Sequence, residues 1–134
     1  MQEVAVTHHK RRANGILQHY VDAGSGAPVV LLHGFPETSY AWRQQIPVLA
    51  QHYRVIAPDL RGYGETEKPS TGYDKRTMAN DLCALLDSLG IERIALVAMT
   101  AVHVLLRALP RIIRSGSNVW SLWTMFQHER FPPR

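Results

Sequence analysis

Three short, largely apolar stretches divide the chain: Val29–Leu32, Tyr53–Ala57 and Ile94–Val97. Apolar runs of this length are typical of strands that are buried on both faces of a parallel sheet. Residues Ile16–Val21 instead alternate apolar and polar side chains, which predicts an edge strand with one solvated face. The turn cluster at residues 23–28 ends that strand and precedes the first buried one.

Between these strands the apolar residues recur at helical spacing. Trp42, Ile46 and Leu49 fall on one face of a predicted helix, which Thr38 or Ser39 can cap. A second predicted helix ends at Gly90, and its apolar face consists of Met78, Leu82, Leu85, Leu86 and Leu89. Strands and helices therefore alternate, which predicts an α/β fold with a parallel sheet and right-handed crossovers.

Length and composition indicate one folded domain. The chain has 134 residues, of which 46% are hydrophobic and 19% charged, as expected of a globular protein. No run approaches the ~18 apolar residues of a membrane span, and the polar, basic start is unlike a signal peptide. The single cysteine, Cys83, excludes an internal disulfide and is expected to be buried filler. We therefore expect a cytoplasmic protein with no membrane partner.

The net charge of +4 is unevenly distributed. Residues 1–97 hold ten Lys/Arg and ten Asp/Glu, whereas residues 98–134 hold five arginines and only Glu129. A basic tail can bind nucleic acid. The basic stretch Thr7–Arg12 is also compatible with a metal or nucleic-acid patch, but an exposed leader into the first strand is favoured.

Several motifs, in their order and spacing, resemble the α/β-hydrolase superfamily over residues 15–97. They are His33-Gly34-Phe35-Pro36-Glu37, Trp42-Arg43, residues 55–64 (VIAPDLRGYG), Tyr73-Asp74 and Leu89-Gly90-Ile91. Within that superfamily they are similar to the branch of epoxide hydrolases and haloacetate or haloalkane dehalogenases. The resemblance implies a parallel-sheet hydrolase core acting on a small-molecule substrate, with no cofactor and no metal.

The resemblance also implies roles for individual positions. The backbone N–H groups of Phe35 and Ala101 would form the oxyanion hole. The nucleophile would stand at position 100, after the strand Ile94–Val97, as an aspartate that forms a covalent ester. A histidine-activated water would then hydrolyse the ester, and the acid and the histidine would come later in the chain.

The sequence departs from this pattern at the nucleophile. Thr100 stands where the aspartate is expected, and Val102 stands where a small residue allows close packing. The printed chain stops at Arg134, before the cap domain, the late acid and the late histidine of the family. His103 and His128 do not have the position of the catalytic histidine. We therefore expect a core truncated after the elbow helix, without a cap domain and catalytically incomplete.

The genetic code offers an explanation for this departure. Joining the third base of each codon to the first two of the next gives the codons of a neighbouring frame. Met99 is encoded only by ATG, so its G and the AC of Thr100 give GAC, an aspartate codon. With permitted choices at the free bases, the joins from Val97 to Leu105 encode Gly-His-Asp-Arg-Gly-Ala-Arg-Val, a family-like elbow. We hypothesise that one base was lost near Val97 and that residues 98–134 are translated out of frame.

Two alternatives remain open. In one, Thr100 is a serine-like nucleophile, and a second chain supplies the missing groups. In the other, the chain is a non-enzymatic binding module whose arginine-rich tail, with Trp120 and Trp123, contacts nucleic acid or a partner protein. We favour a chain with no nucleic-acid partner.

The organisation predicted from these observations has two parts. Residues 1–110 form the N-terminal part of a hydrolase domain, and residues 111–134 form a tail that is either irregular or non-native. A sheet that ends at the strand Ile94–Val97 has an open edge. We therefore predict self-association through this edge, poor solubility, or incomplete folding past Leu109.

Overall fold

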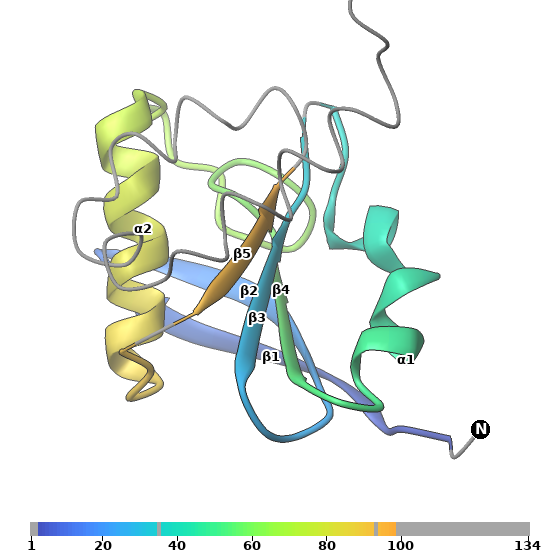
Figure 1. Cartoon of the computed structure of the whole chain (residues 1–134). Coiled ribbons are helices and arrows are strands. Elements are labelled where there is room, and N and C mark those ends of the chain that lie inside the picture. Colours follow the sequence, from blue (N-terminus) through green and yellow to red (C-terminus); the bar gives the residue numbers. More distant parts are fainter. Residues whose placement is uncertain (1–2, 35, 93, 99–134) are drawn as a thin grey trace, which may run out of the picture.

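The computed structural model describes residues 3–34, 36–92 and 94–98, and shows one sheet with helices on both faces (Figure 1). The strands lie in the order β1-β2-β4-β3-β5. Their bounds are Val6–Ala13 for β1, Ile16–Ala23 for β2, Pro28–Leu32 for β3, Arg54–Pro58 for β4 and Ala95–Ala98 for β5. The helices are the 3-10 helix η1 (Ser39–Trp42), the short α1 (Gln45–Leu49) and α2 (Lys75–Ser88).

The sheet is mixed, with a parallel part and an antiparallel part. Strands β4, β3 and β5 run parallel, whereas β1 and β2 pair antiparallel with each other and β2 pairs antiparallel with β4. The three apolar stretches are the parallel strands, as predicted from their composition. The predicted α/β class is therefore confirmed, and an antiparallel hairpin extends it.

The prediction of an edge strand at Ile16–Val21 was wrong. That stretch belongs to β2, which lies between β1 and β4 and is largely buried. The exposed leader predicted at Thr7–Arg12 is instead part of β1, the exposed edge strand. The cause is the two-residue turn at Asn14 and Gly15, whose φ angles of 52° and 78° fit a hairpin turn of the Asn-Gly kind.

Two apolar clusters hold the helices against the sheet. On one face, α2 packs onto strands β2, β3, β4 and β5 through a cluster that includes Leu82, Leu85 and Leu86. On the other face, Trp42 and Ile46 pack onto the same sheet from η1 and α1 (Figure 1). The predicted apolar faces are therefore confirmed, but the single helix predicted around Trp42 and Leu49 is two short helices, η1 and α1, with a turn at residues 43–44 between them. Cys83 is half-buried and packs against the first cluster, as expected of filler.

Local signals in the sequence fix the ends of the helices. The side chain of Thr38 accepts the Tyr40 N–H at 3.3 Å, so Thr38 is the residue that caps η1. Asp74 caps α2 by accepting the Thr77 N–H at 3.0 Å. Gly90 follows α2 with a φ of 70°, which places it at the predicted C′ position.

The rest of the predicted organisation lies outside the described residues. This applies to the helix expected from Val104, to the boundary at residue 110 and to the tail 111–134. Within residues 3–34, 36–92 and 94–98, no helix has both the length and the apolar composition needed to cross a membrane. Self-association through the sheet edge stays a prediction.

Candidate active site

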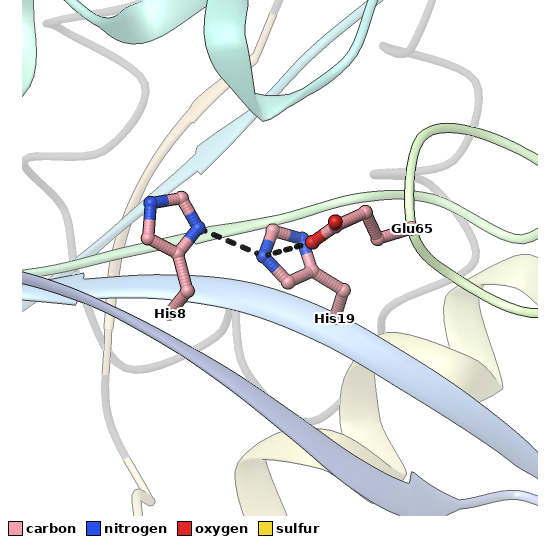
Figure 2. A group of neighbouring side chains, drawn as sticks. All are labelled: His8, His19 and Glu65. Atoms are coloured by element: carbon pink, nitrogen blue, oxygen red, sulfur yellow. Dashed lines mark hydrogen bonds and ion pairs between the residues drawn. The ribbon is translucent and has the colours of Figure 1, made fainter.

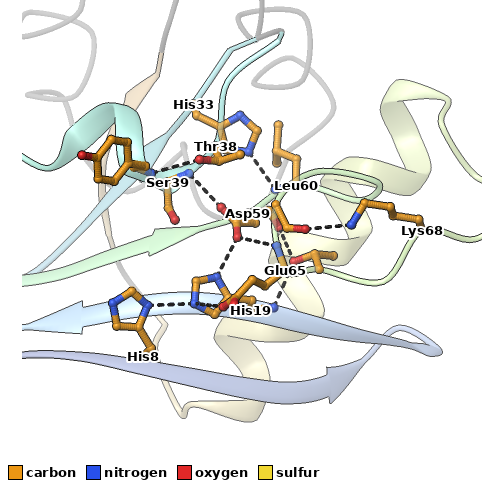
Figure 3. A network of polar contacts seen from close by, with 12 residues as sticks. His8, His19, His33, Thr38, Ser39, Asp59, Leu60, Glu65 and Lys68 are labelled. Atoms are coloured by element: carbon orange, nitrogen blue, oxygen red, sulfur yellow. Dashed lines mark hydrogen bonds and ion pairs between the residues drawn. The ribbon is translucent and has the colours of Figure 1, made fainter.

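The carboxyl ends of the three parallel strands share one edge of the sheet. Strands β3 and β5 end side by side, because Leu32 pairs with Ala98 in register. Strand β3 continues directly into His33 and Gly34, and β4 continues into Asp59. In open α/β sheets, ligands bind in the crevice outside the carboxyl ends of the strands. This edge, shown in part in Figure 3, is therefore the candidate active site.

His33 holds two loops together at this edge. Its side chain is fully buried; Nε2 accepts the Leu60 N–H at 2.9 Å, and Nδ1 donates to the Gly34 carbonyl at 3.0 Å. These partners assign the proton to Nδ1. Burial lowers the pKa of His33, although the Gly34 hydrogen bond and the nearby Asp59 oppose the shift. A neutral imidazole with both nitrogens engaged positions the loop and is not free to act as a base.

The loop after His33 makes a tight turn. The Glu37 N–H donates to the Gly34 carbonyl at 2.8 Å, and Pro36 lies exposed within the turn. Phe35, whose backbone N–H was predicted for the oxyanion hole, lies outside the described residues. The motif residues His33, Gly34 and Pro36 therefore follow the end of β3, at the carboxyl edge of the sheet. This is the edge at which the oxyanion hole was predicted.

Asp59 is the centre of a buried polar network (Figure 3). Its Oδ1 accepts the Ser39 N–H at 2.7 Å, and its Oδ2 accepts the Glu65 N–H at 3.0 Å and contacts His19 Nδ1 at 2.7 Å. Burial raises the pKa of Asp59, but the hydrogen bonds from Ser39, Glu65 and His19 outweigh it and leave the pKa below its usual value. An ionised carboxylate thus ties β2 and the start of η1 to the loop after β4.

Two further residues complete this network. The Thr66 hydroxyl donates to the Asp59 carbonyl at 2.7 Å and accepts the His19 N–H at 2.9 Å. Gly64 has a φ of 53°, and a Cβ at this position would overlap the Asp59 carboxylate. Only glycine therefore fits here without moving the carboxylate.

A second network joins the same loop to α2. Arg61 donates from Nε and Nη2 to the two carboxylate oxygens of Asp81, at 2.8 and 2.7 Å. Asn14 donates to the same carboxylate at 2.8 Å, and Arg61 Nη1 donates to the Thr71 carbonyl at 3.1 Å. The Asp81 hydrogen bond raises the pKa of Arg61, and the two side chains form a buried ion pair.

The other predicted site residues, Thr100 and Ala101, lie outside the described residues. The sequence alone indicated no role for Asp59, Arg61 or Asp81. Asp59 and Arg61 nevertheless lie in residues 55–64, one of the motifs that resemble the α/β-hydrolase superfamily. The stretch around His8 was considered as a metal patch, but its partners were not found: His8, His19 and Glu65 bring three possible metal-ligand atoms within 4.8 Å of one another. The sequence separates these residues too widely for a spacing rule to find them.

Comparison with known proteins supports the hydrolase-like interpretation. The model of the family described as alpha/beta hydrolase fold matches residues 27–99. The soluble epoxide hydrolase of Corynebacterium sp. (strain C12) is 54% identical over 92 residues, which cover 69% of this chain and 32% of that protein. The chain thus spans about a third of the length of this curated relative.

Solved structures give the same result. The structure of the epoxide hydrolase CorEH without ligand matches with a TM-score of 0.75 and 48% identity, over 78% of this chain and 37% of that one. The haloalkane dehalogenase DatA from Agrobacterium tumefaciens C58 matches with a TM-score of 0.67 and 37% identity, over 71% and 33%. The chain is therefore related to both epoxide hydrolases and haloalkane dehalogenases.

Proposed function

Because this chain belongs to the alpha/beta hydrolase fold family, we propose that its described part forms the oxyanion-hole side of a core that acts on small epoxides or halogenated acids. The observation that supports this most directly is the register of β3 and β5. Leu32 pairs with Ala98, so the strand leading into His33 and Gly34 ends beside the strand leading to position 100. A substrate oxygen bound between the two strand ends would meet backbone donors from both.

In this proposal the Phe35 and Ala101 N–H groups bind the oxygen on which charge develops. Preorganised backbone donors of this kind stabilise an oxyanion without the cost of reorienting solvent. Hydrogen bonds to the loop after β4 anchor the chain before and after Phe35. His33 accepts the Leu60 N–H, and Asp59 accepts the Ser39 N–H. Neither residue touches the substrate in this scheme, so both are positioning residues.

We further propose that the chain as printed does not complete the reaction. A carboxylate at position 100 would attack the epoxide or halogen-bearing carbon and form an ester, whereas Thr100 offers a hydroxyl that first needs a base. His33, the histidine of the motif at this edge, uses both ring nitrogens and is therefore not available as that base.

A turnover assay tests this proposal. The full chain is incubated with styrene oxide, fluoroacetate and chloroacetate, and diol, glycolate and halide are measured. The Corynebacterium relative is the positive control for the epoxide. We expect no product above the buffer blank. Turnover that disappears in a Thr100→Ala variant would overturn the proposal and support the serine-like use of Thr100.

A second proposal concerns the origin of residues 98–134. The family match ends at residue 99, and the charge excess begins at residue 98. Both observations fit the loss of one base near Val97, which would replace the aspartate codon by that of Thr100. Sequencing the coding DNA tests this: we expect the neighbouring frame to encode a hydrolase-like elbow after Val97. A neighbouring frame interrupted by stop codons, or without Asp-Arg-Gly, would contradict it.

A further inference from the structure

Three side chains from three separate segments meet beside the Asp59 network. His8 comes from β1, His19 from β2 and Glu65 from the loop after β4 (Figure 2). His8 Nδ1 lies 3.0 Å from His19 Nε2, which lies 3.2 Å from a Glu65 carboxylate oxygen. His19 is buried, whereas His8 and Glu65 are exposed, so the group opens to solvent on one side.

Asp59 determines which His19 nitrogen faces His8 and Glu65. His19 Nδ1 lies 2.7 Å from the ionised Asp59 carboxylate, which is a hydrogen-bond acceptor only. His19 Nδ1 therefore donates to Asp59, and Nε2 is the nitrogen that faces His8 and Glu65. A carboxylate that holds a histidine in this way is the usual partner of a metal-ligating imidazole, because it orients the ring and increases its basicity.

The three facing atoms are all of kinds that bind metal ions. His8 Nδ1, His19 Nε2 and a Glu65 carboxylate oxygen lie within 4.8 Å of one another. A cation bound between them would accept a lone pair from each of the three side chains.

We propose that His8, His19 and Glu65 form a binding site for a divalent transition-metal ion, with Zn²⁺ as the best match. Two imidazole nitrogens and one carboxylate oxygen are ligands that Zn²⁺ accepts, whereas Ca²⁺ and Mg²⁺ prefer oxygen ligands alone. Ligands about 2.0–2.1 Å from a tetrahedral zinc ion lie roughly 3.3–3.4 Å apart. The separations of 3.0 and 3.2 Å are close to this value.

The remaining separation, between His8 Nδ1 and the Glu65 carboxylate, can be adjusted by movement of the Glu65 side chain. The Glu65 side chain is 63% exposed, so it can rotate toward His8 without disturbing the core. Its backbone N–H stays bound to Asp59 and keeps the loop in place. The ion would join the β1–β2 hairpin to the loop after β4, with water completing its coordination. The site is therefore proposed as a clamp on the fold, separate from the reaction at position 100.

Zinc binding to the full chain tests the proposal. The protein is purified without a histidine tag, stripped with chelator and dialysed against ZnCl₂, and bound zinc per chain is measured with the thermal midpoint. We expect one zinc ion that raises the midpoint, because it binds the folded state. His8→Ala and Glu65→Gln should each weaken binding by at least the 10–100-fold that loss of an outer-shell partner costs.

His9→Ala is the matched control. His9 is the exposed neighbour of His8 on β1, and it contacts Thr7 and not the proposed site. We expect this variant to bind zinc as tightly as the unchanged chain, and we expect CaCl₂ to leave the midpoint unchanged. The proposal is overturned if no zinc binds, if His8→Ala binds as tightly as the unchanged chain, or if His9→Ala loses as much affinity as His8→Ala.

Discussion

Two buried carboxylates, Asp59 and Asp81, receive their hydrogen bonds from different kinds of donor. Asp59 accepts hydrogen bonds from two backbone N–H groups and from His19. Asp81 accepts a bidentate pair of hydrogen bonds from Arg61 and one hydrogen bond from Asn14. The donors of Asp59 lie in segments that surround the carboxyl edge of the sheet. The donors of Asp81 lie in the loop after β4 and in the β1–β2 turn, and their hydrogen bonds join both segments to the helix α2.

Because their donors differ, the two carboxylates have different roles in the structure. The Asp59 network sets the path of the backbone at the candidate active site, because two of its donors are backbone N–H groups, one at the start of η1 and one in the loop after β4. The Asp81 network connects distant elements through a buried ion pair, in which each charge depends on the other. We therefore expect substitutions in the Asp81 network to reduce stability more than substitutions around Asp59.

The largest expected effect is that of Asp81→Ala. Removing one partner leaves the Arg61 guanidinium buried without its counter-charge, which costs about 3–5 kcal/mol. Urea unfolding followed by circular dichroism measures the change. Asp87→Ala, on an exposed position of the same helix, is the control and should cost less than about 0.5 kcal/mol. Equal losses in the two variants would contradict the role given to the ion pair.

A smaller loss is expected for Gly64→Ala, in which the new methyl group overlaps the Asp59 carboxylate. Gly15→Ala is the matched control, because Gly15 also has a positive φ but has no atom within 4 Å of an added Cβ. The control should cost roughly 1–2 kcal/mol through backbone strain alone. Gly64→Ala should cost more, about 2–4 kcal/mol, because overpacking adds about 1–3 kcal/mol. A Gly64→Ala variant as stable as the control would show that the Asp59 carboxylate is not tightly placed.

The smallest expected effect is a dependence of stability on pH. The pKa of His33 is lower in the folded chain than its ordinary value of 6.5, so the unfolded chain binds the proton more readily. Stability should therefore fall as the pH decreases below about 6.5. The pKa of Asp59 is also lower in the folded chain than its ordinary value of 3.8. The ionised Asp59 therefore contributes stability above about pH 3.8, and this contribution is lost as the pH falls through the lowered pKa.

Comparison with His33→Gln isolates the first of these changes. Thermal midpoints of both proteins are measured from pH 8 to pH 4 in the same buffers. The difference between them should shrink between neutral pH and pH 5, because only the unchanged chain loses the His33 contribution. A constant difference across this range would contradict a buried, neutral His33.

Much of the fold follows from the sequence, whereas the networks do not. Apolar runs and helical spacing predicted the parallel strands and α2, since these elements depend on local pattern. The hairpin was missed because the charges of Thr7–Arg12 hid a strand, although the Asn14-Gly15 turn signalled it. The contacts of Asp59 and Asp81 join residues up to 67 positions apart. No local pattern indicates such pairs, so they appear only when the chain is folded.

The central proposal is that residues 27–98 form one edge of a hydrolase site and that Thr100, at the nucleophile position, does not react. Intact-mass and peptide mass spectrometry after incubation with styrene oxide or chloroacetate tests it directly, with Thr100→Ala as the matched control. We predict no covalent adduct on the peptide that contains residue 100 in either protein. An adduct mapped to Thr100, and absent from the Thr100→Ala variant, would contradict the claim.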